Sequence, residues 1–196
     1  SQSRQYLRRS LNMQRSAETH LKDDYEIGKL LGAGGFCKVN LATHVLTGEQ
    51  VAIKIVKLSD ALKNARFGES HINNLRAEHL AMARFDHPNI VALYETFATP
   101  QMMYISMEYA AGGDLTDYVL SQGHLEEGES AKLTHQLLSA LQHVHNNGIV
   151  HRDVKPDNVL LDRHRNVKLA DFGLSAQWSA NSPSGLEGLE WGGTPS

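Results

Sequence analysis

The first half of the chain carries short runs in which apolar and polar residues alternate, a pattern typical of half-buried β-strands. One segment of this kind spans residues 25–56. It is broken by the glycines at 32–35 and by Thr47-Gly48, a dipeptide that suits a hairpin turn, so we expect three strands there. Two more strand-like runs, residues 90–97 and 102–108, flank Pro100. The pattern therefore predicts five strands before residue 109.

A helical pattern interrupts the strands between residues 73 and 85. Four residues recur there at the spacing of one helix face: Leu75, Glu78, Met82 and Phe85. The sequence His-Pro-Asn at 87–89 ends this helix, because a residue that precedes proline avoids the helical conformation. Glu78 is thus a carboxylate that shares a face with apolar residues.

The pattern becomes helical again beyond Ala111-Gly112-Gly113, which punctuates the chain as a linker would and marks a domain boundary. Four apolar residues then form one stripe: Leu133, Leu137, Leu141 and Val144. Gly148 follows at the place of a helix C-terminal cap. We expect this helix to be largely buried.

The two ends of the chain lack such patterns. Residues 1–22 are polar and arginine-rich without a long helical stripe, and we expect them to form a flexible basic arm. Residues 181–196 are rich in glycine, serine and proline, which predicts a mobile tail. The chain begins with Ser1 and not with a methionine, so we interpret it as a fragment of a longer protein.

Composition narrows the classes of function. The 196 residues are 41% apolar and 21% charged, which is ordinary for a globular protein. A net charge of -3 gives no global basic field, so we expect no nucleic-acid partner. One cysteine excludes an internal disulfide, and no run of about 18 apolar residues suits a membrane span. We expect an intracellular protein, in the cytoplasm or alternatively the nucleus; the oligomeric state stays open.

A glycine-rich run at residues 32–39 lies between two of the predicted strands. Its backbone N–H groups could close over phosphate, although such a run is more often a plain turn. A Rossmann site is excluded because no helix follows the glycines. The strand Val51-Ala52-Ile53-Lys54 then places a lysine beside inward apolar residues, where an unpaired ammonium is costly. Phosphate or Glu78 could pair with Lys54; the alternative is a lysine whose head reaches solvent.

Two polar clusters carry the chemistry. The first is His-Arg-Asp-Val-Lys-Pro-Asp-Asn at 151–158, and the second is Asp-Phe-Gly at 171–173. An apolar strand at 159–161 follows the first cluster, and another at 167–170 precedes the second. A hairpin of these two strands would bring both clusters to one end.

Together these motifs resemble the signature of eukaryotic protein kinases, over about residues 25–196. Lys155 matches the serine/threonine type, and residues 34–49 resemble the AMP-activated-kinase-related branch. The resemblance implies an α+β, bilobal fold. Its N-lobe, residues 23–108, would hold five strands and one helix and bind ATP. Residues 109–196 would form an incomplete, mainly helical C-lobe with the catalytic loop and the start of the activation segment.

The resemblance also implies roles. Lys54 would bind the α and β phosphates of ATP and pair with Glu78, while Asn158 and Asp171 would bind Mg²⁺. Asp153 would accept or orient the substrate hydroxyl proton, and Lys155 would steady the γ phosphate. The remaining nucleotide-binding positions would be Gly32, Ala33, Gly34, Gly35, Phe36, Cys37, Val39, Ala52, Met107, Glu108, Ala110, Asp114 and Leu160.

Two readings of the function follow. The first is an ATP-dependent kinase that phosphorylates Ser/Thr hydroxyls of proteins; Asp114 and Asp157 match positions that recognise an upstream arginine. The second is a truncated nucleotide-binding or regulatory module without phosphate transfer. Cys37 replaces the third glycine of the loop and is either a reactive thiol or a plain small residue.

The resemblance is weakest at the end of the chain. Glu190 stands where related kinases carry an activating threonine, and its charge could partly replace a phosphate. Helices that would normally cover the stripe of residues 133–144 do not follow in this sequence. We therefore expect that stripe to present apolar surface to water.

Overall fold

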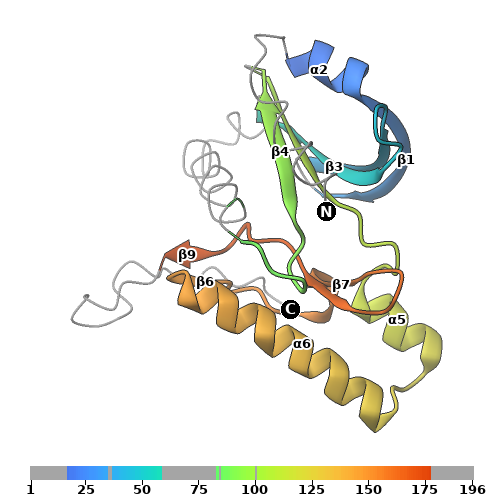
Figure 1. Cartoon of the computed structure of the whole chain (residues 1–196), viewed down its shortest axis with the longest axis vertical. Coiled ribbons are helices and arrows are strands. Elements are labelled where there is room, and N and C mark those ends of the chain that lie inside the picture. The colour runs from blue at the N-terminus through green and yellow to red at the C-terminus, as the bar shows by residue number, and fades with distance from the viewer. Residues whose placement is uncertain (1–16, 35–36, 59–82, 84, 100, 178–196) are drawn as a thin grey trace. The chain divides into compact units, whose positions relative to one another are not determined.

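The computed structural model describes residues 17–34, 37–58, 83, 85–99 and 101–177, and the chain divides into two compact units (Figure 1). One unit comprises Ser1–His79 and Leu93–Tyr109; the other comprises Leu80–Ala92 and Ala110–Ser196. The chain therefore passes between units after Tyr109, one residue beyond the boundary expected from the sequence. Residues 80–92 belong to the second unit, although the sequence assigned them to the first.

The first unit is built on a five-stranded antiparallel sheet with strand order β1-β2-β3-β5-β4. The strands are β1 (Tyr25–Ala33), β2 (Cys37–His44), β3 (Gln50–Lys57), β4 (Leu93–Ala98) and β5 (Met102–Glu108). The five predicted strands are thus confirmed. The fourth begins at Leu93 and not at 90, because Ile90 forms a parallel bridge to Leu169 in the second unit.

The middle strand supplies the core of this sheet. Val51, Ile53 and Val56 of β3, the third of the five strands in the sheet order, are almost fully buried. The hairpin before it closes at Gly48, whose φ of 67° favours glycine and whose N–H donates to the His44 carbonyl over 2.8 Å. The predicted turn at Thr47-Gly48 is confirmed.

The N-terminal end of the described chain differs from the sequence prediction. Ala17–Asp24 forms helix α2, where an irregular arm was expected, and leads directly into β1. Tyr25, the first residue of β1, is buried, and its hydroxyl donates to the carboxylate of Glu95 on β4. Burial and this carboxylate raise the pKa of Tyr25 well above its ordinary value, so the phenol stays neutral and fixes β1 to the sheet.

In its described residues, the second unit combines two α-helices with short strands (Figure 1). Helix α5 (Leu115–Gln122) begins at Asp114, which accepts a hydrogen bond from the N–H of Asp117, and ends at Gly123 with φ of 78°. Helix α6 (Glu127–Asn146) ends just before Asn147-Gly148, as predicted. The strands form two antiparallel pairs: β6 (Ile149–Val150) with β9 (Ala176–Gln177), and β7 (Val159–Leu161) with β8 (Val167–Leu169).

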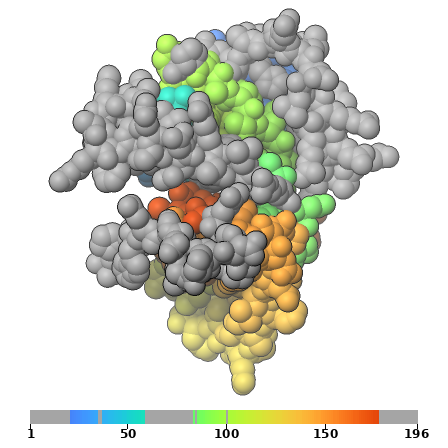
Figure 2. Space-filling view, turned by 90° about the vertical axis from the view of Figure 1, so that its left-hand side faces the viewer, coloured from blue at the N-terminus to red at the C-terminus, as the bar shows by residue number. Residues whose placement is uncertain are grey.

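Helix α6 packs on β8 and β6 through Leu133, Ala140 and Val144, which are at most 4% exposed. The expectation that this stripe would face water is therefore wrong for Leu133 and Val144, because the short strands cover them. Another face of the helix is open, where Leu138 is 60% exposed. Figure 2 shows side chains of α6, in yellow and orange, along the surface of this unit. No helix in the described ranges is long and apolar enough to cross a membrane.

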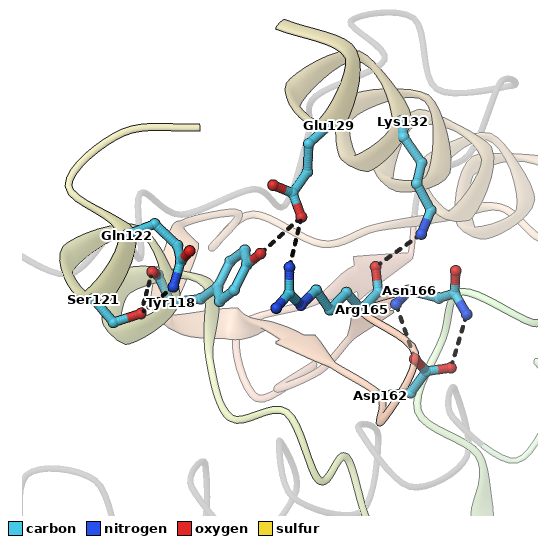
Figure 3. A network of polar contacts seen from close by, with 8 residues as sticks. All are labelled: Tyr118, Ser121, Gln122, Glu129, Lys132, Asp162, Arg165 and Asn166. Atoms are coloured by element: carbon cyan, nitrogen blue, oxygen red, sulfur yellow. Dashed lines mark hydrogen bonds and ion pairs between the residues drawn. The ribbon is translucent and has the colours of Figure 1, made fainter. Parts of the chain in front are cut away.

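A polar network joins α5, α6 and the turn between β7 and β8 (Figure 3). The Tyr118 hydroxyl donates to Glu129 Oε1 over 2.8 Å, and Arg165 Nη1 lies 3.8 Å from the same oxygen. Lys132 Nζ donates to the Arg165 carbonyl over 3.2 Å. Within the turn, Asp162 accepts the N–H groups of His164 and Asn166. Although burial raises the pKa of Asp162, these bonds lower it overall, so the turn is held by an ionised carboxylate.

Candidate active site

The two polar clusters predicted from the sequence lie at one end of the β7–β8 hairpin. Val159 pairs with Leu169, so Asn158 and Ala170 stand just outside the first and last paired residues. The N–H of Ala170 donates to the Asn158 carbonyl over 2.9 Å, which joins the clusters directly. The prediction that a hairpin would bring them together is confirmed.

Asp153 is the centre of a compact group of polar side chains. Its Oδ2 lies 3.0 Å from Lys155 Nζ and accepts a 2.9 Å hydrogen bond from Asn158 Nδ2. The same amide nitrogen donates to the Asp153 carbonyl over 2.8 Å. Burial raises the pKa of Asp153, but the hydrogen bonds from Lys155 and Asn158 outweigh it, so the pKa lies below its usual value. The carboxylate is therefore ionised at neutral pH.

The buried side chain of His151 orients the polar group around Asp153, a role that the sequence did not reveal. It is 1% exposed, and its Nε2 donates to the Ala170 carbonyl over 3.0 Å. Its Nδ1 accepts the N–H of Asp153 over 3.3 Å. The imidazole thus bridges the backbone of both clusters. The available signal was its place directly after the apolar β6, which made a buried histidine plausible.

Two residues of the clusters have a backbone conformation that is rare outside glycine. Arg152 has φ of 68° and Asp171 has φ of 58°, both in the left-handed region. Such strain persists only where the surroundings impose it, and it gathers at functional sites. Arg152 is held by a bond from its Nε to the Leu174 carbonyl. Next to the exposed Asp171, Phe172 is fully buried, so the turn directs one side chain outward and the other inward.

The oxygen atoms at this end of the hairpin suit Mg²⁺. Asn158 and Asp171 offer an amide and a carboxylate oxygen, and Mg²⁺ at phosphate sites takes one or two such ligands besides the phosphates. Both hydrogen bonds from the Asn158 side chain to Asp153 are donated by its Nδ2 and leave its Oδ1 aside. Among the described residues, no three His, Cys, Asp or Glu side chains are grouped to hold a metal by themselves. One amide and one carboxylate oxygen fit a Mg²⁺ that also binds phosphate oxygens.

In the first unit, the sheet register places several predicted nucleotide-binding residues on one face. Val39 pairs with Lys54, and Ala52 pairs with Met107. Directly opposed residues share a face, and so do residues two apart in a strand, so Val39, Ala52, Lys54 and Met107 lie on the same side of the sheet. Lys54 is half-buried there. Glu108, the last residue of β5, pairs with Val51.

In the second unit, Ala110, Asp114 and Leu160 form another group. Asp114 bridges to Leu160, and Gly112 donates to the Leu161 carbonyl over 2.8 Å. The approach is close: a Cβ on Gly112 would lie 2.7 Å from the Asp162 carbonyl oxygen. Asp114 also caps α5 through its Oδ1, as described above. If Asp114 also binds the nucleotide, as predicted, its carboxylate serves both the nucleotide and the cap of α5.

The glycine-rich run is described in part. Gly32 and Ala33 end β1, Cys37 begins β2, and the N–H of Gly34 donates to the Cys37 carbonyl over 2.9 Å. Cys37 is half-buried. Gly35, Phe36, Glu78 and Glu190 lie outside the described residues, as do residues 73–82 and 84 of the helix predicted over 73–85. Asp157 is exposed, in the short 3-10 helix Pro156–Asn158.

Comparison with known proteins matches residues 25–191 to the protein kinase domain family. Among curated relatives, CBL-interacting serine/threonine-protein kinase 24 of Arabidopsis thaliana is 45% identical over 78% of this chain and 33% of its own length. SNF1-related protein kinase catalytic subunit alpha KIN12 of Arabidopsis thaliana is also 45% identical, over 78% of this chain and 30% of its own. Serine/threonine protein kinase OSK3 of Oryza sativa is 43% identical, over 78% and 29%. The chain thus spans about a third of these relatives' length.

Proposed function

The chain belongs to the protein kinase family, and we propose that the protein of which it is part transfers the γ phosphate of Mg-ATP to Ser and Thr hydroxyls of proteins. The observation that carries this proposal is the ionised Asp153, held by Lys155 and Asn158 at the hairpin end that also bears Asp171. A carboxylate, an ammonium and an amide in this arrangement match the needs of phosphoryl transfer.

In the proposed reaction, a bond forms between the substrate oxygen and the γ phosphorus, and the bond from this phosphorus to the bridging oxygen of ADP breaks. Asp153 accepts or orients the hydroxyl proton, and its low pKa keeps it ready to do so. Lys155 steadies the transferred phosphoryl group, and Lys54 holds the α and β phosphates. Bound Mg²⁺ would neutralise phosphate charge, with Asn158 and Asp171 as its protein ligands.

We propose protein substrates with a basic residue before the phosphorylated Ser or Thr. Asp114 and Asp157 support this, since carboxylates pair with arginine through charge-assisted hydrogen bonds. The exposed position of Asp157 leaves it accessible. Within the family, the sequence of residues 34–49 supports a relationship to maternal embryonic leucine zipper kinase. An intracellular location remains part of the proposal.

The alternative is a nucleotide-binding or regulatory module that does not transfer phosphate. We favour the enzyme because a chain without a catalytic task has no physical need for the costly polar cluster in which Lys155 and Asn158 bond to Asp153.

Peptide phosphorylation tests both the reaction and the substrate class. The chain is incubated with Mg-ATP and two matched peptide sets, which differ only in whether an arginine or an alanine precedes the Ser or Thr. We expect phosphate incorporation, with a higher kcat/KM for the arginine set. Equal kcat/KM for the two peptide sets would contradict the proposed preference for a basic residue but not the kinase activity itself. Nucleotide binding without phosphate incorporation into either peptide set would favour the regulatory module.

A further inference from the structure

The segment from Phe85 to Val91 lies along the edge of β8 that β7 leaves open. Asn89 Nδ2 donates to the Val167 carbonyl over 3.0 Å, and the N–H of Leu169 donates to the Asn89 carbonyl over 2.8 Å. The N–H of Val91 donates to the Leu169 carbonyl over 3.0 Å. β8 is therefore held on both edges, and this segment provides one of them.

His87 connects that segment to α6. Its Nδ1 accepts the N–H of Asn89 over 3.1 Å, and its Nε2 lies 3.1 Å from Ser139 Oγ on α6. A backbone N–H can only donate, so Nδ1 must be without a proton. His87 is thus the neutral imidazole with its proton on Nε2, where it donates to Ser139. Both ring nitrogens are used, and the contact of Nδ1 with the N–H of Asn89 exists only while Nδ1 carries no proton.

The surroundings of His87 oppose a second proton. His143 on α6 faces it with the ring centroids 5.1 Å apart, and Lys168 on β8 acts on it through its charge. Asp86, the neighbour in sequence, is exposed. Burial, His143 and Lys168 lower the pKa of His87, in that order. In the described part of the chain, Nε2 of His143 is itself buried without a hydrogen-bond partner.

We propose that His87 is a proton-sensitive latch: its neutral ring holds the segment 85–91 on β8 through Asn89, and protonation of Nδ1 releases this hold. A proton on Nδ1 would face the N–H of Asn89, so two donors would meet where a hydrogen bond now forms. The bond that organises Asn89 is lost, and with it the support of Asn89 for Val167 and Leu169.

The latch acts on the strand that presents the proposed metal ligand. Ala170 follows β8 and is bonded to Asn158 and His151, and Asp171 comes next. Phe85, two residues before His87, packs on Phe172 with the ring centroids 5.1 Å apart. Release of the segment therefore loosens the support of Asp171 from two directions. This consequence for Asp171 rests on the proposed function; the latch itself does not.

The sign of the pH effect follows from linkage. The pKa of His87 in the native state lies below its ordinary value of about 6.5, so near that pH the unfolded chain binds more protons than the native chain. The contribution of His87 to stability is complete above about pH 6.5. It falls as the pH drops towards the native pKa and changes no further below it.

The test is an NMR titration of the chain with ¹⁵N-labelled histidine from pH 8 to 5, combined with hydrogen exchange of the Asn89 and Leu169 amides. We expect the Nε2–H tautomer of His87 at pH 8 and titration below pH 6.5. Across that transition, exchange at both amides, corrected for the intrinsic pH dependence, should rise about fivefold, the effect of losing one buried hydrogen bond.

His143→Gln provides a variant that leaves the latch residues in place. Because His143 lowers the pKa of His87, its replacement should move the His87 titration and the rise in amide exchange together to higher pH. His135→Gln, an exposed histidine on the same helix, should leave both unchanged. The proposal would be overturned by an Nδ1–H tautomer of His87 or by its titration at or above pH 6.5. It would also be overturned if exchange of the Asn89 and Leu169 amides did not change across the His87 titration. None of these readouts uses ATP or a peptide, so failure of the proposed kinase activity would be seen separately.

Discussion

The Asp153 carboxylate is held by two neighbours. Its Oδ2 lies 3.0 Å from Lys155 Nζ and accepts a 2.9 Å hydrogen bond from Asn158 Nδ2. Asp153→Asn keeps the size of the side chain but removes its charge and its ability to accept a proton. We predict that kcat for peptide phosphorylation falls by about 10²–10⁴-fold, the usual range for loss of a general base. Asp117→Asn, an exposed carboxylate on α5, is the matched control and should retain activity. Equal kcat in the two variants would contradict the role of Asp153.

The pH dependence of Asp153 follows from the same contacts. Burial raises its pKa, yet the bonds from Lys155 and Asn158 hold the pKa below the ordinary 3.8. Its share of the folding free energy is therefore complete above about pH 4 and is lost only as the pH falls through its lowered native pKa. We predict that protonation of Asp153 does not limit kcat between pH 7 and 5. A kcat that falls in this range, and no longer does so in Asp153→Asn, would contradict this.

Residue spacing predicted the members of this cluster but not how they are held. Asp153, Lys155, Asn158 and Asp171 are recognisable because their types recur at fixed positions around two apolar strands. The bridging role of His151 and the left-handed backbone of Arg152 depend on contacts with residues 170–174, about 20 positions away. Such contacts have no local pattern, so the sequence could not reveal them.

At the scale of elements, the close approach of the 110–114 segment to β7 gives a test of how the second unit is built. A Cβ on Gly112 would lie within 3 Å of the carbonyl oxygens of Leu161 and Asp162. We predict that Gly112→Ala lowers the free energy of unfolding by about 1–3 kcal/mol, because two backbones must separate. Urea unfolding measures this.

Gly128→Ala is the matched control. Gly128 lies in the first turn of α6, and a Cβ there would meet nothing within 4 Å. Alanine favours the helix over glycine by up to about 1 kcal/mol, so this variant should be as stable as the parent or more so. Equal stability of the two variants would contradict the close approach of Gly112 to Leu161 and Asp162.

Elements with a clear local pattern were predictable, and the exceptions have physical reasons. The β7–β8 hairpin and β5 follow from apolar runs between polar turns. β4 was expected from residue 90, since Ile90 and Val91 continue its apolar run; both bond instead to Leu169 of the second unit. Helix α5 was not foreseen: it has no buried residue, and its start depends on the cap by Asp114.

At the scale of the whole chain, the proposed residues for ATP and Mg²⁺ are divided between the two units. Lys54 lies on β3 of the first, and Asp171 follows β8 of the second. The sequence predicted a division of the chain near residue 109. It did not predict that residues 80–92 belong to the second unit, because this depends on the hydrogen bonds of Asn89 and Val91 to β8. The proposal requires both residues for binding of Mg-ATP, so removal of either should abolish binding.

Thermal unfolding of the chain with and without Mg-ATP tests this central claim most directly. Ligand at about 100 times its Kd should stabilise a formed site by about 2.7 kcal/mol, seen as a magnesium-dependent rise in Tm. We predict that Lys54→Ala and Asp171→Ala each abolish the rise, and that Lys29→Ala, an exposed lysine on β1, retains it. No shift in the parent chain, or a shift that survives both substitutions, would contradict the proposed binding of Mg-ATP by these residues.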